Sequence, residues 1–297
     1  MFMDLSIIIV NYNTKQLTLN TIHSVFASST LFRYEIILVD NHSSDGTVEE
    51  VSKAFPEVRT ISNRHNLGFS KANNLGMQIA QGRYILLLNS DTVIMPDTLD
   101  TMITFMDEHP KVGASGCKLL LADGSLDKTC KRGFPTPLNA LYYLSGISRL
   151  FPRNPQFNQY QMSHIDPDQE TQIDCLVGAF MMVRRETIAQ VGMLDEVFFM
   201  YGEDIDWCYR IKEAGWDIYY YPKTHIIHYK GASSKQKPVK IIYEFHRAMI
   251  LFHRKHYQDK YNGLINLLVY SGIYLKMSME IMYNWFRYKL LRLERGS

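Results

Sequence analysis

Residues 86–93 read Leu-Leu-Leu-Asn-Ser-Asp-Thr-Val, and this stretch decides how the chain folds. The apolar run at residues 84–88 is typical of a short strand that is buried on both faces, as in parallel sheets. The run stops abruptly at Asn89, Ser90 and Asp91. Ligands of such sheets bind beyond the carboxyl ends of the strands, so these three side chains are candidates for a binding site. They are also common turn residues, and an ordinary turn is the alternative.

The chain before this stretch shows the same arrangement three more times. Apolar segments that predict strands occupy residues 6–10, 34–39 and 58–62. Segments that predict helices follow them at residues 16–26, at residues 47–54 and up to about residue 80. Polar loops follow the three strands and include Asn11, Asp40 and Asn66. Strands that alternate with helices predict an α/β fold with a mostly parallel sheet, and four polar loops at one edge of that sheet indicate a site.

The second half of the chain is less regular. A helix is expected at residues 96–107, a strand at residues 112–121, and a further apolar segment at residues 176–183. Residues 135–174 show no sustained period. They predict a long excursion, partly helical at residues 138–150, of the kind that shapes a binding site.

The carboxyl-terminal region is helical by composition, at residues 239–261 and 264–293. Its longest charge-free span, residues 261–274, is too short to cross a membrane, which takes about 20 residues. Apolar and aromatic residues with a basic rim from Arg287 to Arg295 favour helices that lie in a membrane interface. The alternative is a helical pair that packs on the rest of the chain or on another subunit.

Composition sets the limits of the interpretation. The 297 residues are 46% hydrophobic and 21% charged, which is typical of a globular protein. We expect a domain at residues 1–238 and an amphipathic helical segment at residues 239–297. With 32 Lys and Arg against 30 Asp and Glu, the net charge of +2 gives no electrostatic case for nucleic acid. No Gly-x-Gly-x-x-Gly follows the first strand, which argues against a dinucleotide-binding oxidoreductase.

Cysteine usage and the amino-terminal residues bear on the compartment. The cysteines are widely spaced, at Cys117, Cys130, Cys175 and Cys208. This spacing suggests neither a zinc site nor a disulfide framework, so we expect reduced thiols in the cytosol. Residues 1–4 lack the basic start and long apolar stretch of a signal peptide.

The polar residues at the sheet edge suit a nucleotide sugar, whose diphosphate must be held and made a good leaving group. A divalent cation does this by neutralising negative charge. Asp91 is the obvious carboxylate ligand, and either His225 or His228 could complete the metal site. Without a metal, basic side chains such as Lys71 or Arg210 would hold the diphosphate.

The base of the nucleotide has its own candidates. Asp40 can accept a hydrogen bond from the N3–H of a pyrimidine, although it could equally cap a helix. The loop from Val10 to Asn13 would surround the same base with backbone groups and with the ring of Tyr12.

Transfer to an alcohol also needs a general base, and Glu203 and Asp204 are adjacent carboxylates at an expected helix start. Only one of them is expected to face the sugar. The alternative is that both complement the helix dipole and stay ionised.

Six motifs together carry a resemblance to a known family. They are Ser-Ile-Ile-Ile-Val-Asn-Tyr-Asn (6–13), Val-Asp-Asn-His-Ser-Ser-Asp-Gly-Thr (39–47), Asn-Leu-Gly-Phe-Ser-Lys-Ala-Asn-Asn (66–74), Leu-Asn-Ser-Asp (88–91), Phe-Phe-Met-Tyr-Gly-Glu-Asp-Ile-Asp-Trp-Cys-Tyr-Arg (198–210) and His-Tyr-Lys-Gly-Ala-Ser (228–233). Over residues 5–233 the chain resembles the family 2 inverting glycosyltransferases of the GT-A fold, and most of all the bacterial rhamnosyltransferases of cell-wall or surface polysaccharide.

This resemblance implies roles for particular residues. Asp40 matches the base-binding aspartate, Asp204 the catalytic base and His228 the late metal-binding histidine. The family's Asp-x-Asp position is occupied by Asn89, Ser90 and Asp91, so an amide replaces the first carboxylate and adds no charge to the metal. Further donor-binding candidates are Val10, Tyr12, Asn66 and Lys71.

The resemblance also implies partners. The expected donor is dTDP-L-rhamnose with Mn²⁺ or Mg²⁺, and the expected acceptor is a lipid-linked saccharide. The enzyme would be cytoplasmic and peripheral at the inner face of the cell membrane, with a homo-oligomer as an open option. The same fold using a UDP-hexose is the first alternative. A second is an inactive nucleotide-sugar-binding module, against which the presence of both Asp91 and Asp204 argues.

Overall fold

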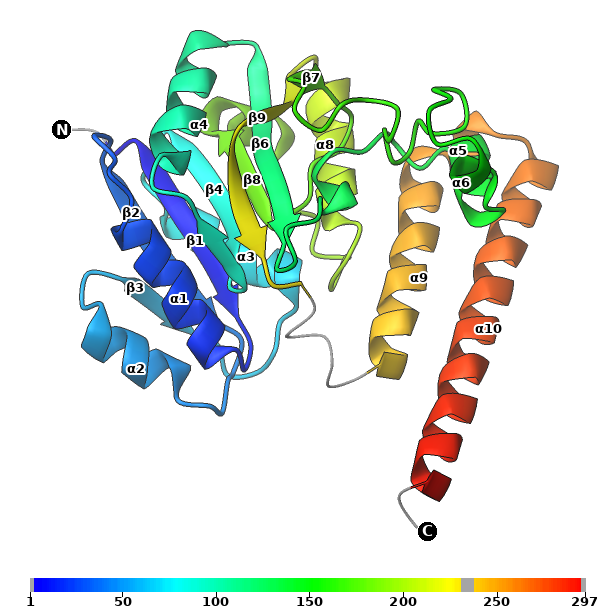
Figure 1. Cartoon of the computed structure of the whole chain (residues 1–297), viewed down its shortest axis with the longest axis horizontal. Helices are drawn as coiled ribbons and strands as arrows, with labels where there is room; N and C mark the ends of the chain where they lie inside the picture. The colour runs from blue at the N-terminus through cyan, green and yellow to red at the C-terminus, as the bar shows by residue number, and fades with distance from the viewer. Residues whose placement is uncertain (1–2, 231–237, 295–297) are drawn as a thin grey trace.

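A single central sheet with helices packed against it organises the molecule (Figure 1). The computed structural model describes residues 3–230 and 238–294, with side chains for residues 3–230 and 239–286. Two long helices at the carboxyl-terminal end lie to one side of the sheet.

The first four strands on the sheet path are parallel, as predicted. They are β3 (Arg59–Ser62), β2 (Tyr34–Asp40), β1 (Leu5–Asn11) and β4 (Tyr84–Asn89). The path continues through β8 (Phe180–Arg184), β6 (Val112–Leu121), β9 (Asp217–His228) and β5 (Thr92–Ile94), with β7 (Thr171–Gln172) paired to β9. Strand β9 runs parallel to β6, whereas β8, β5 and β7 run antiparallel to their neighbours. The predicted α/β class is therefore confirmed, with a mixed sheet.

The main body contains the helices that the sequence predicted and one that it did not predict, at Arg185–Val191. They are α1 (Lys15–Phe26), α2 (Thr47–Ala54), α3 (Phe69–Ile79), α4 (Thr98–Glu108), α5 (Pro137–Leu144), α6 (Ile147–Leu150), α7 (Arg185–Val191) and α8 (Glu203–Glu213), with a 3₁₀ turn η1 (Lys128–Cys130). Sequence reasoning did not predict β9 as a strand. Its burial alternates at Ile218 and Tyr220 and again at Ile226 and His228, but exposed Lys223 interrupts the apolar pattern between them.

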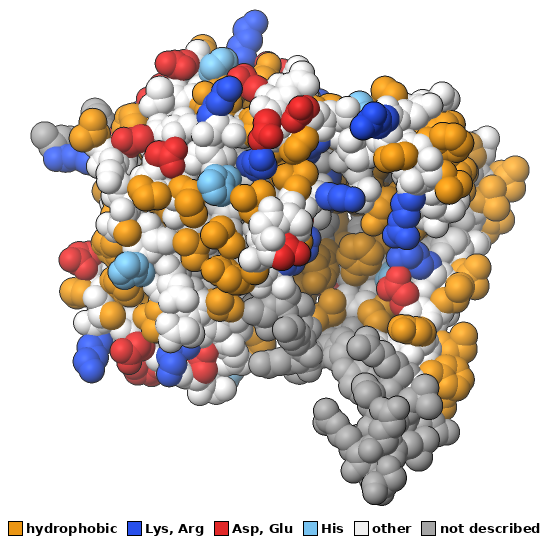
Figure 2. Space-filling model, viewed as in Figure 1, with side chains coloured by type: hydrophobic (Ala, Val, Ile, Leu, Met, Phe, Trp, Pro, Cys, Tyr) orange, Lys and Arg blue, Asp and Glu red, His pale blue; other side chains and the backbone are white. Residues whose placement is uncertain are grey.

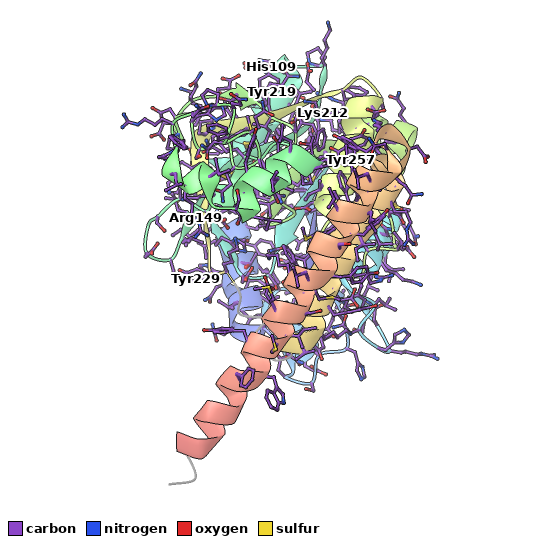
Figure 3. All side chains as sticks on the ribbon, turned by 90° about the vertical axis from the view of Figure 1, so that its right-hand side faces the viewer. His109, Arg149, Lys212, Tyr219, Tyr229 and Tyr257 are labelled. Carbon is purple, nitrogen blue, oxygen red and sulfur yellow. The ribbon has the colours of Figure 1, made fainter. Side chains whose placement is uncertain are left out.

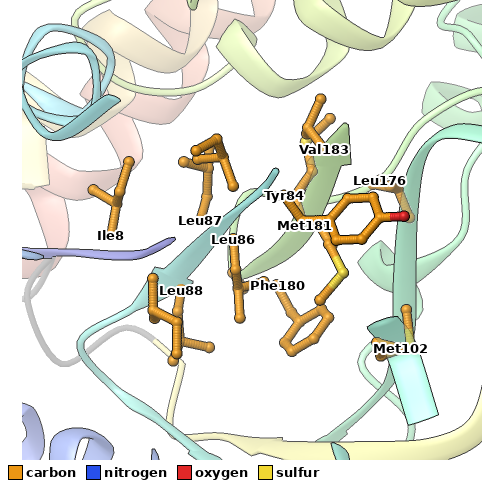
Figure 4. Close-up of a cluster of buried hydrophobic side chains, with 14 of the residues drawn as sticks. Ile8, Tyr84, Leu86, Leu87, Leu88, Met102, Leu176, Phe180, Met181 and Val183 are labelled. Atoms are coloured by element: carbon orange, nitrogen blue, oxygen red, sulfur yellow. The ribbon is translucent and has the colours of Figure 1, made fainter. Parts of the chain in front are cut away.

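Strand β4 shows why its sequence is apolar without alternation. It lies between β1 and β8, so both of its faces are covered and residues 84–88 are all buried. Figure 4 shows Leu86 and Leu88 of β4 among Ile8, Phe180 and other core side chains. The strand therefore holds its polar end, at Asn89, in a fixed place in the sheet.

The carboxyl-terminal helices are α9 (Pro238–His256) and α10 (Gly263–Glu294), joined by the 3₁₀ turn η2 (Gln258–Lys260). They lie side by side in Figures 1 and 3. Tyr209 of α8 packs with Phe252 of α9, and with Tyr257 just after that helix, in a second apolar cluster. The buried Asp206 of α8 lies 2.7 Å from His256 and pairs with Lys255 at 2.8 Å, so an ion pair also fixes α9 to α8.

The amphipathic character of α10 is only partly visible. Large apolar side chains are exposed along it, at Leu264, Leu267, Leu275, Met279 and Met282. The side chains of the basic rim predicted from Arg287 to Arg295 lie outside the described residues. Among the helices that the structure describes, none combines the length and the hydrophobicity that a bilayer span requires.

Candidate functional site

The carboxyl ends of β1 and β2 meet at Asp40. The Asn11 side chain donates from Nδ2 to Asp40 Oδ1 at 2.7 Å, and the Ser43 backbone N–H donates to Oδ2 at 2.8 Å. Asp40 is almost fully buried. Since α2 begins at Thr47, with Gly46 as its cap, Asp40 is not the cap of that helix. A carboxylate oxygen has a second lone pair, so Asp40 can still accept from a ligand.

The third loop joins this edge to the segment before α8. Asn41 Nδ2 donates to the Gly68 carbonyl at 2.9 Å, and Asn66 Oδ1 accepts from the Gly68 N–H. Gly68 has φ +84°, and a Cβ there would lie 2.3 Å from the Phe199 carbonyl. Only glycine allows this approach. The loop that precedes α8 is therefore docked at this edge of the sheet.

Strand β4 carries the next three candidates. Val10 of β1 pairs with Asn89, which places the two at the same level of the sheet edge. Ser90 Oγ lies 3.1 Å from Thr14 Oγ1 and is buried. Asn89 Nδ2 lies 3.5 Å from His228 Nε2, so the amide at the Asp-x-Asp position faces the histidine.

Asp91 and His228 lie together, as the sequence predicted. His228 Nε2 is 3.3 Å from Asp91 Oδ1, and that oxygen is buried without a hydrogen-bond partner among the described residues. His225 and His228 are three positions apart on β9, so their side chains point to opposite faces, and His228 is on the buried one. The open choice between the two histidines therefore falls on His228.

Asp127 is part of the same cluster, and sequence reasoning missed it. Its Oδ2 lies 3.0 Å from His228 Nδ1, and Lys230 Nζ donates to its Oδ1 at 3.0 Å. Burial alone would raise the pKa of Asp127, but these partners hold that pKa well below its usual range. Burial alone would lower the pKa of His228, but Asp127 and Asp91 raise it to about 9. Asp127 also accepts a hydrogen bond from the Thr129 N–H at the start of η1. The sequence around Asp127 therefore resembles that of an ordinary turn.

This cluster fits a divalent cation. A metal-binding imidazole commonly has its other ring nitrogen held by a carboxylate, which is the position of Asp127. Asp91 Oδ1, which has no hydrogen-bond partner among the described residues, and His228 Nε2 would hold the ion. Among the described residues no group of three or more His, Cys, Asp or Glu side chains could hold a metal. The other ligands would therefore be phosphate oxygens and water, as is usual for Mg²⁺.

The start of α8 forms a second charged cluster. Arg132 Nη2 donates to Asp204 Oδ2 at 2.7 Å and to the Leu176 carbonyl, and Asp204 Oδ1 accepts from the Ile205 N–H. Arg132 and Asp204 are both nearly buried. Burial alone would lower the pKa of Arg132, but Asp204 more than offsets this and raises it above its usual range. No motif around Arg132 pointed to this role.

Glu203 differs from its neighbour. Burial, and then the Asp204 carboxylate, raise the pKa of Glu203 to about 8. Its Oε2 is buried and has no hydrogen-bond partner among the described residues. The sequence alternative in which both carboxylates stay ionised at the helix start is therefore wrong for Glu203, because desolvation outweighs the helix dipole.

Three other candidates are less closely tied to these clusters. Lys71 is exposed and lies 3.9 Å from Glu196. Tyr12 is partly buried just beyond β1. Arg210 donates to Asp206 and to two backbone carbonyls, so its guanidinium is engaged within the protein.

Comparison with solved structures identifies the architecture. The chain superposes on a mannosyltransferase from Pyrobaculum calidifontis in complex with GDP-Man and Mn²⁺, with a TM-score of 0.59, 15% identity, and coverage of 94% of this chain and 72% of the other. It also superposes on GalNAc-T7 with UDP, GalNAc and Mn²⁺, with a TM-score of 0.58, 16% identity, and coverage of 80% and 45%. The fold is thus the GT-A fold.

Sequence comparison identifies the family. Bacterial rhamnosyltransferases are among the relatives. The N-acetylglucosaminyl-diphospho-decaprenol L-rhamnosyltransferase of Mycobacterium tuberculosis is 28% identical over 228 residues, which is 73% of each chain. Rhamnosyltransferase WbbL of Escherichia coli is 28% identical over 204 residues, 66% of this chain and 73% of the relative. The family model "Glycosyl transferase family 2" matches residues 6–192. The chain therefore belongs to glycosyl transferase family 2.

Proposed function

We propose that this glycosyltransferase moves L-rhamnose from dTDP-L-rhamnose to a hydroxyl of a lipid-linked saccharide, with inversion, at a site that includes a divalent cation. The observation that carries the proposal is the unpartnered Asp91 Oδ1 beside His228 Nε2, with Asp127 on the other ring nitrogen. A bound cation there would neutralise charge on the departing diphosphate. The rhamnosyl donor and the diphospho-polyprenol acceptor are suggested by the names of the bacterial relatives.

The site has two ends, and the residues at one of them bind the nucleotide. Asp40 accepts from the pyrimidine N3–H, and Val10, Tyr12 and Asn66 lie on the loops around the nucleotide. Asn89 offers its amide to a ribose hydroxyl, while Ser90 fixes the loop to Thr14. Lys71 remains a candidate for the donor's charged groups.

Asp204 is the proposed general base. The acceptor oxygen forms a bond to the anomeric carbon, the bond from that carbon to the diphosphate oxygen breaks, and the hydroxyl proton passes to the Asp204 carboxylate. Arg132 holds the carboxylate in place at 2.7 Å. Glu203, with its raised pKa, carries the proton at neutral pH and leaves Asp204 as the charged member of the adjacent pair.

A donor panel tests this proposal. Full-length protein is incubated with Mn²⁺, a polyprenyl-diphosphate saccharide and, one at a time, dTDP-L-rhamnose, UDP-glucose, UDP-galactose and UDP-GlcNAc. We expect transfer from dTDP-L-rhamnose and loss of transfer in excess chelator. Transfer from a UDP-hexose alone would mean that the donor is a UDP-hexose and not dTDP-L-rhamnose. Binding without transfer from any donor would favour the inactive binding module.

We also propose that α10 places the enzyme on the inner face of the cell membrane. Its exposed Leu267, Leu275 and Met279 are the support. Flotation with anionic liposomes should recover full-length protein, and the Leu275→Glu, Met279→Glu double variant should float much less. Leu31→Glu, which changes an exposed leucine outside α10, is the control. If the double variant floats unchanged but converts a dimer to a monomer, the helix is an oligomer interface instead.

A further inference from the structure

An apolar pocket lies between α5, the start of α8, α9 and α10. Its volume is about 670 Å³, within the range of pockets that hold organic ligands. Leu141 of α5, Phe252 of α9 and Val269 of α10 contribute to its walls. Among the described lining residues, His253 and Lys276 are the ones with basic groups, and the others are mostly apolar or aromatic. The lining therefore suits an apolar ligand.

The pocket shares a wall with the proposed catalytic centre. Tyr201, Gly202 and Ile205 line the pocket, and Asp204 lies in the same turn. Tyr201 has φ +70°, an unusual conformation for a residue with a side chain. Its ring packs edge-on against Phe245 of α9, with 5.7 Å between centroids. This packing stabilises the left-handed turn that leads into Asp204, so the pocket and the proposed base are parts of one structure.

The position of the pocket limits which part of an acceptor can enter it. An acceptor whose hydroxyl reaches Asp204 has the rest of its molecule close to Tyr201 and Gly202, and so close to the pocket. Lys276 places an ammonium group 5.8 Å from the centroid of the Phe245 ring, the ring that contacts Tyr201, and pairs with Glu280 at 2.6 Å. The Glu280 carboxylate thus balances the charge of Lys276, and the apolar remainder of the lining suits a hydrocarbon tail.

We propose that this pocket holds the hydrocarbon tail of the acceptor, in the segment next to its diphosphate. The inference rests on the proposed function, in which the acceptor saccharide is carried by a polyisoprenoid lipid. It differs from the membrane contact of α10. That contact uses side chains exposed on the helix, such as Leu275 and Met279, whereas the pocket is a concave space between helices. A space-filling view also shows apolar side chains gathered over the α5, α6 and α10 side of the molecule (Figure 2).

A binding experiment separates the tail from the head group. Geranylgeranyl diphosphate, below the concentration at which it forms micelles, is compared with methyl diphosphate by equilibrium binding to the full-length protein. We expect the long-tailed compound to bind at least about tenfold more tightly, because the pocket removes its tail from water.

Two variants fill the pocket from opposite walls. Val269→Trp enters from α10 and Ala140→Trp enters from α5, so the proposal does not depend on one variant that folds poorly. Ser271→Trp adds the same ring two positions from Val269 at an exposed residue that does not line the pocket. The filled variants should bind both compounds within about twofold of each other, and the control should keep the preference of the wild type.

The outcomes test the pocket proposal separately from the proposed transfer reaction. Equal binding of both compounds by the wild type would overturn it, and so would a preference retained in both filled variants when circular dichroism shows native folding. A change from dimer to monomer in Val269→Trp, with no tail preference in the wild type, would assign the pocket to a second copy and overturn it too. If the tail preference is present but no rhamnose is transferred, the pocket proposal stands and the proposed function fails.

Discussion

The two charged clusters of the molecule are built in opposite ways. At the end of β4 and β9, Asp91 and Asp127 flank His228, and both carboxylates lie within 3.3 Å of its ring nitrogens. At the start of α8, Asp204 is paired with Arg132, while the pKa of Glu203 is raised to about 8. Lys230 offsets one of the two carboxylates of the first cluster, so that cluster is balanced only while His228 carries a proton, whereas the permanent charge of Arg132 balances Asp204 in the second. The first is thus suited to a cation and the second to a proton.

The proton on His228 illustrates this difference. Without a cation, Asp127 and Asp91 raise the pKa of His228 to about 9, so the imidazole ring supplies the positive charge that the carboxylates require. A bound divalent cation would take the place of that proton, because a metal ligand must be the neutral imidazole. Beside Asp204, by contrast, the Arg132 guanidinium carries a permanent charge.

The largest effect should come from the second cluster. Asp204→Asn keeps the shape of the side chain and removes the proton acceptor, so we expect kcat to fall about 100- to 10,000-fold. Donor KM should stay within about threefold, since the change leaves the first cluster intact. Rhamnosyl transfer under saturating Mn²⁺ measures this.

Glu203→Gln is the matched control for that variant. It changes the adjacent carboxyl group by the same chemistry, at a residue that is already protonated at neutral pH, and should retain most of the activity. If Glu203→Gln were inactive and Asp204→Asn active, the roles of the two neighbours would have to be exchanged.

A smaller effect is expected when the carboxylate that orients His228 is changed. Asp127→Asn removes the charge that orients His228 without removing a proposed metal ligand, and should weaken Mn²⁺ binding and turnover about 10- to 100-fold. Mn²⁺ titration of the activity measures it, and higher Mn²⁺ should restore part of the loss. Unchanged Mn²⁺ dependence would mean that Asp127 serves only the turn at η1.

The smallest effect is on stability and comes from Glu203. The pKa of the Glu203 carboxyl group is about 4.5 when the side chain is free in water and about 8 in the fold, so the unfolded chain loses this proton first as the pH rises. The contribution of Glu203 to stability is therefore complete below pH 4.5 and is lost between pH 4.5 and 8. Glu203→Gln should therefore raise the free energy of unfolding at pH 8, and by much less near pH 5. Urea unfolding at both pH values tests this, and a difference independent of pH would contradict the assignment.

Sequence reasoning recovered each cluster in part, since it named Asp91 and His228 in the first and Glu203 and Asp204 in the second. The end of β4 was predictable because a run of buried strand residues must stop in polar ones at the sheet edge, and Asp40 and Asn89 follow from the same rule. Asp127 and Arg132 were missed, because each is a single polar residue in an irregular segment and acts only through contacts with distant residues.

The pocket shows the same limit. Residues 138–150 were expected to be partly helical within an excursion that shapes a site, and α5 and α6 confirm the helical part. Helical composition was equally clear for α9 and α10. That α5, α9 and α10 enclose one space beside Tyr201 depends on packing across more than a hundred residues of sequence. Local patterns carry no information about such contacts.

Direct metal binding tests the difference between the two clusters best. Mn²⁺ is titrated into the full-length protein with dTDP present, and free Mn²⁺ is measured by electron paramagnetic resonance. The wild type and Asp204→Asn should bind a single Mn²⁺ with the same affinity, whereas Asp91→Ala should bind it about 100-fold more weakly. Equal binding by the wild type and Asp91→Ala, or loss of Mn²⁺ in Asp204→Asn alone, would contradict the assignment of the cation to Asp91 and His228.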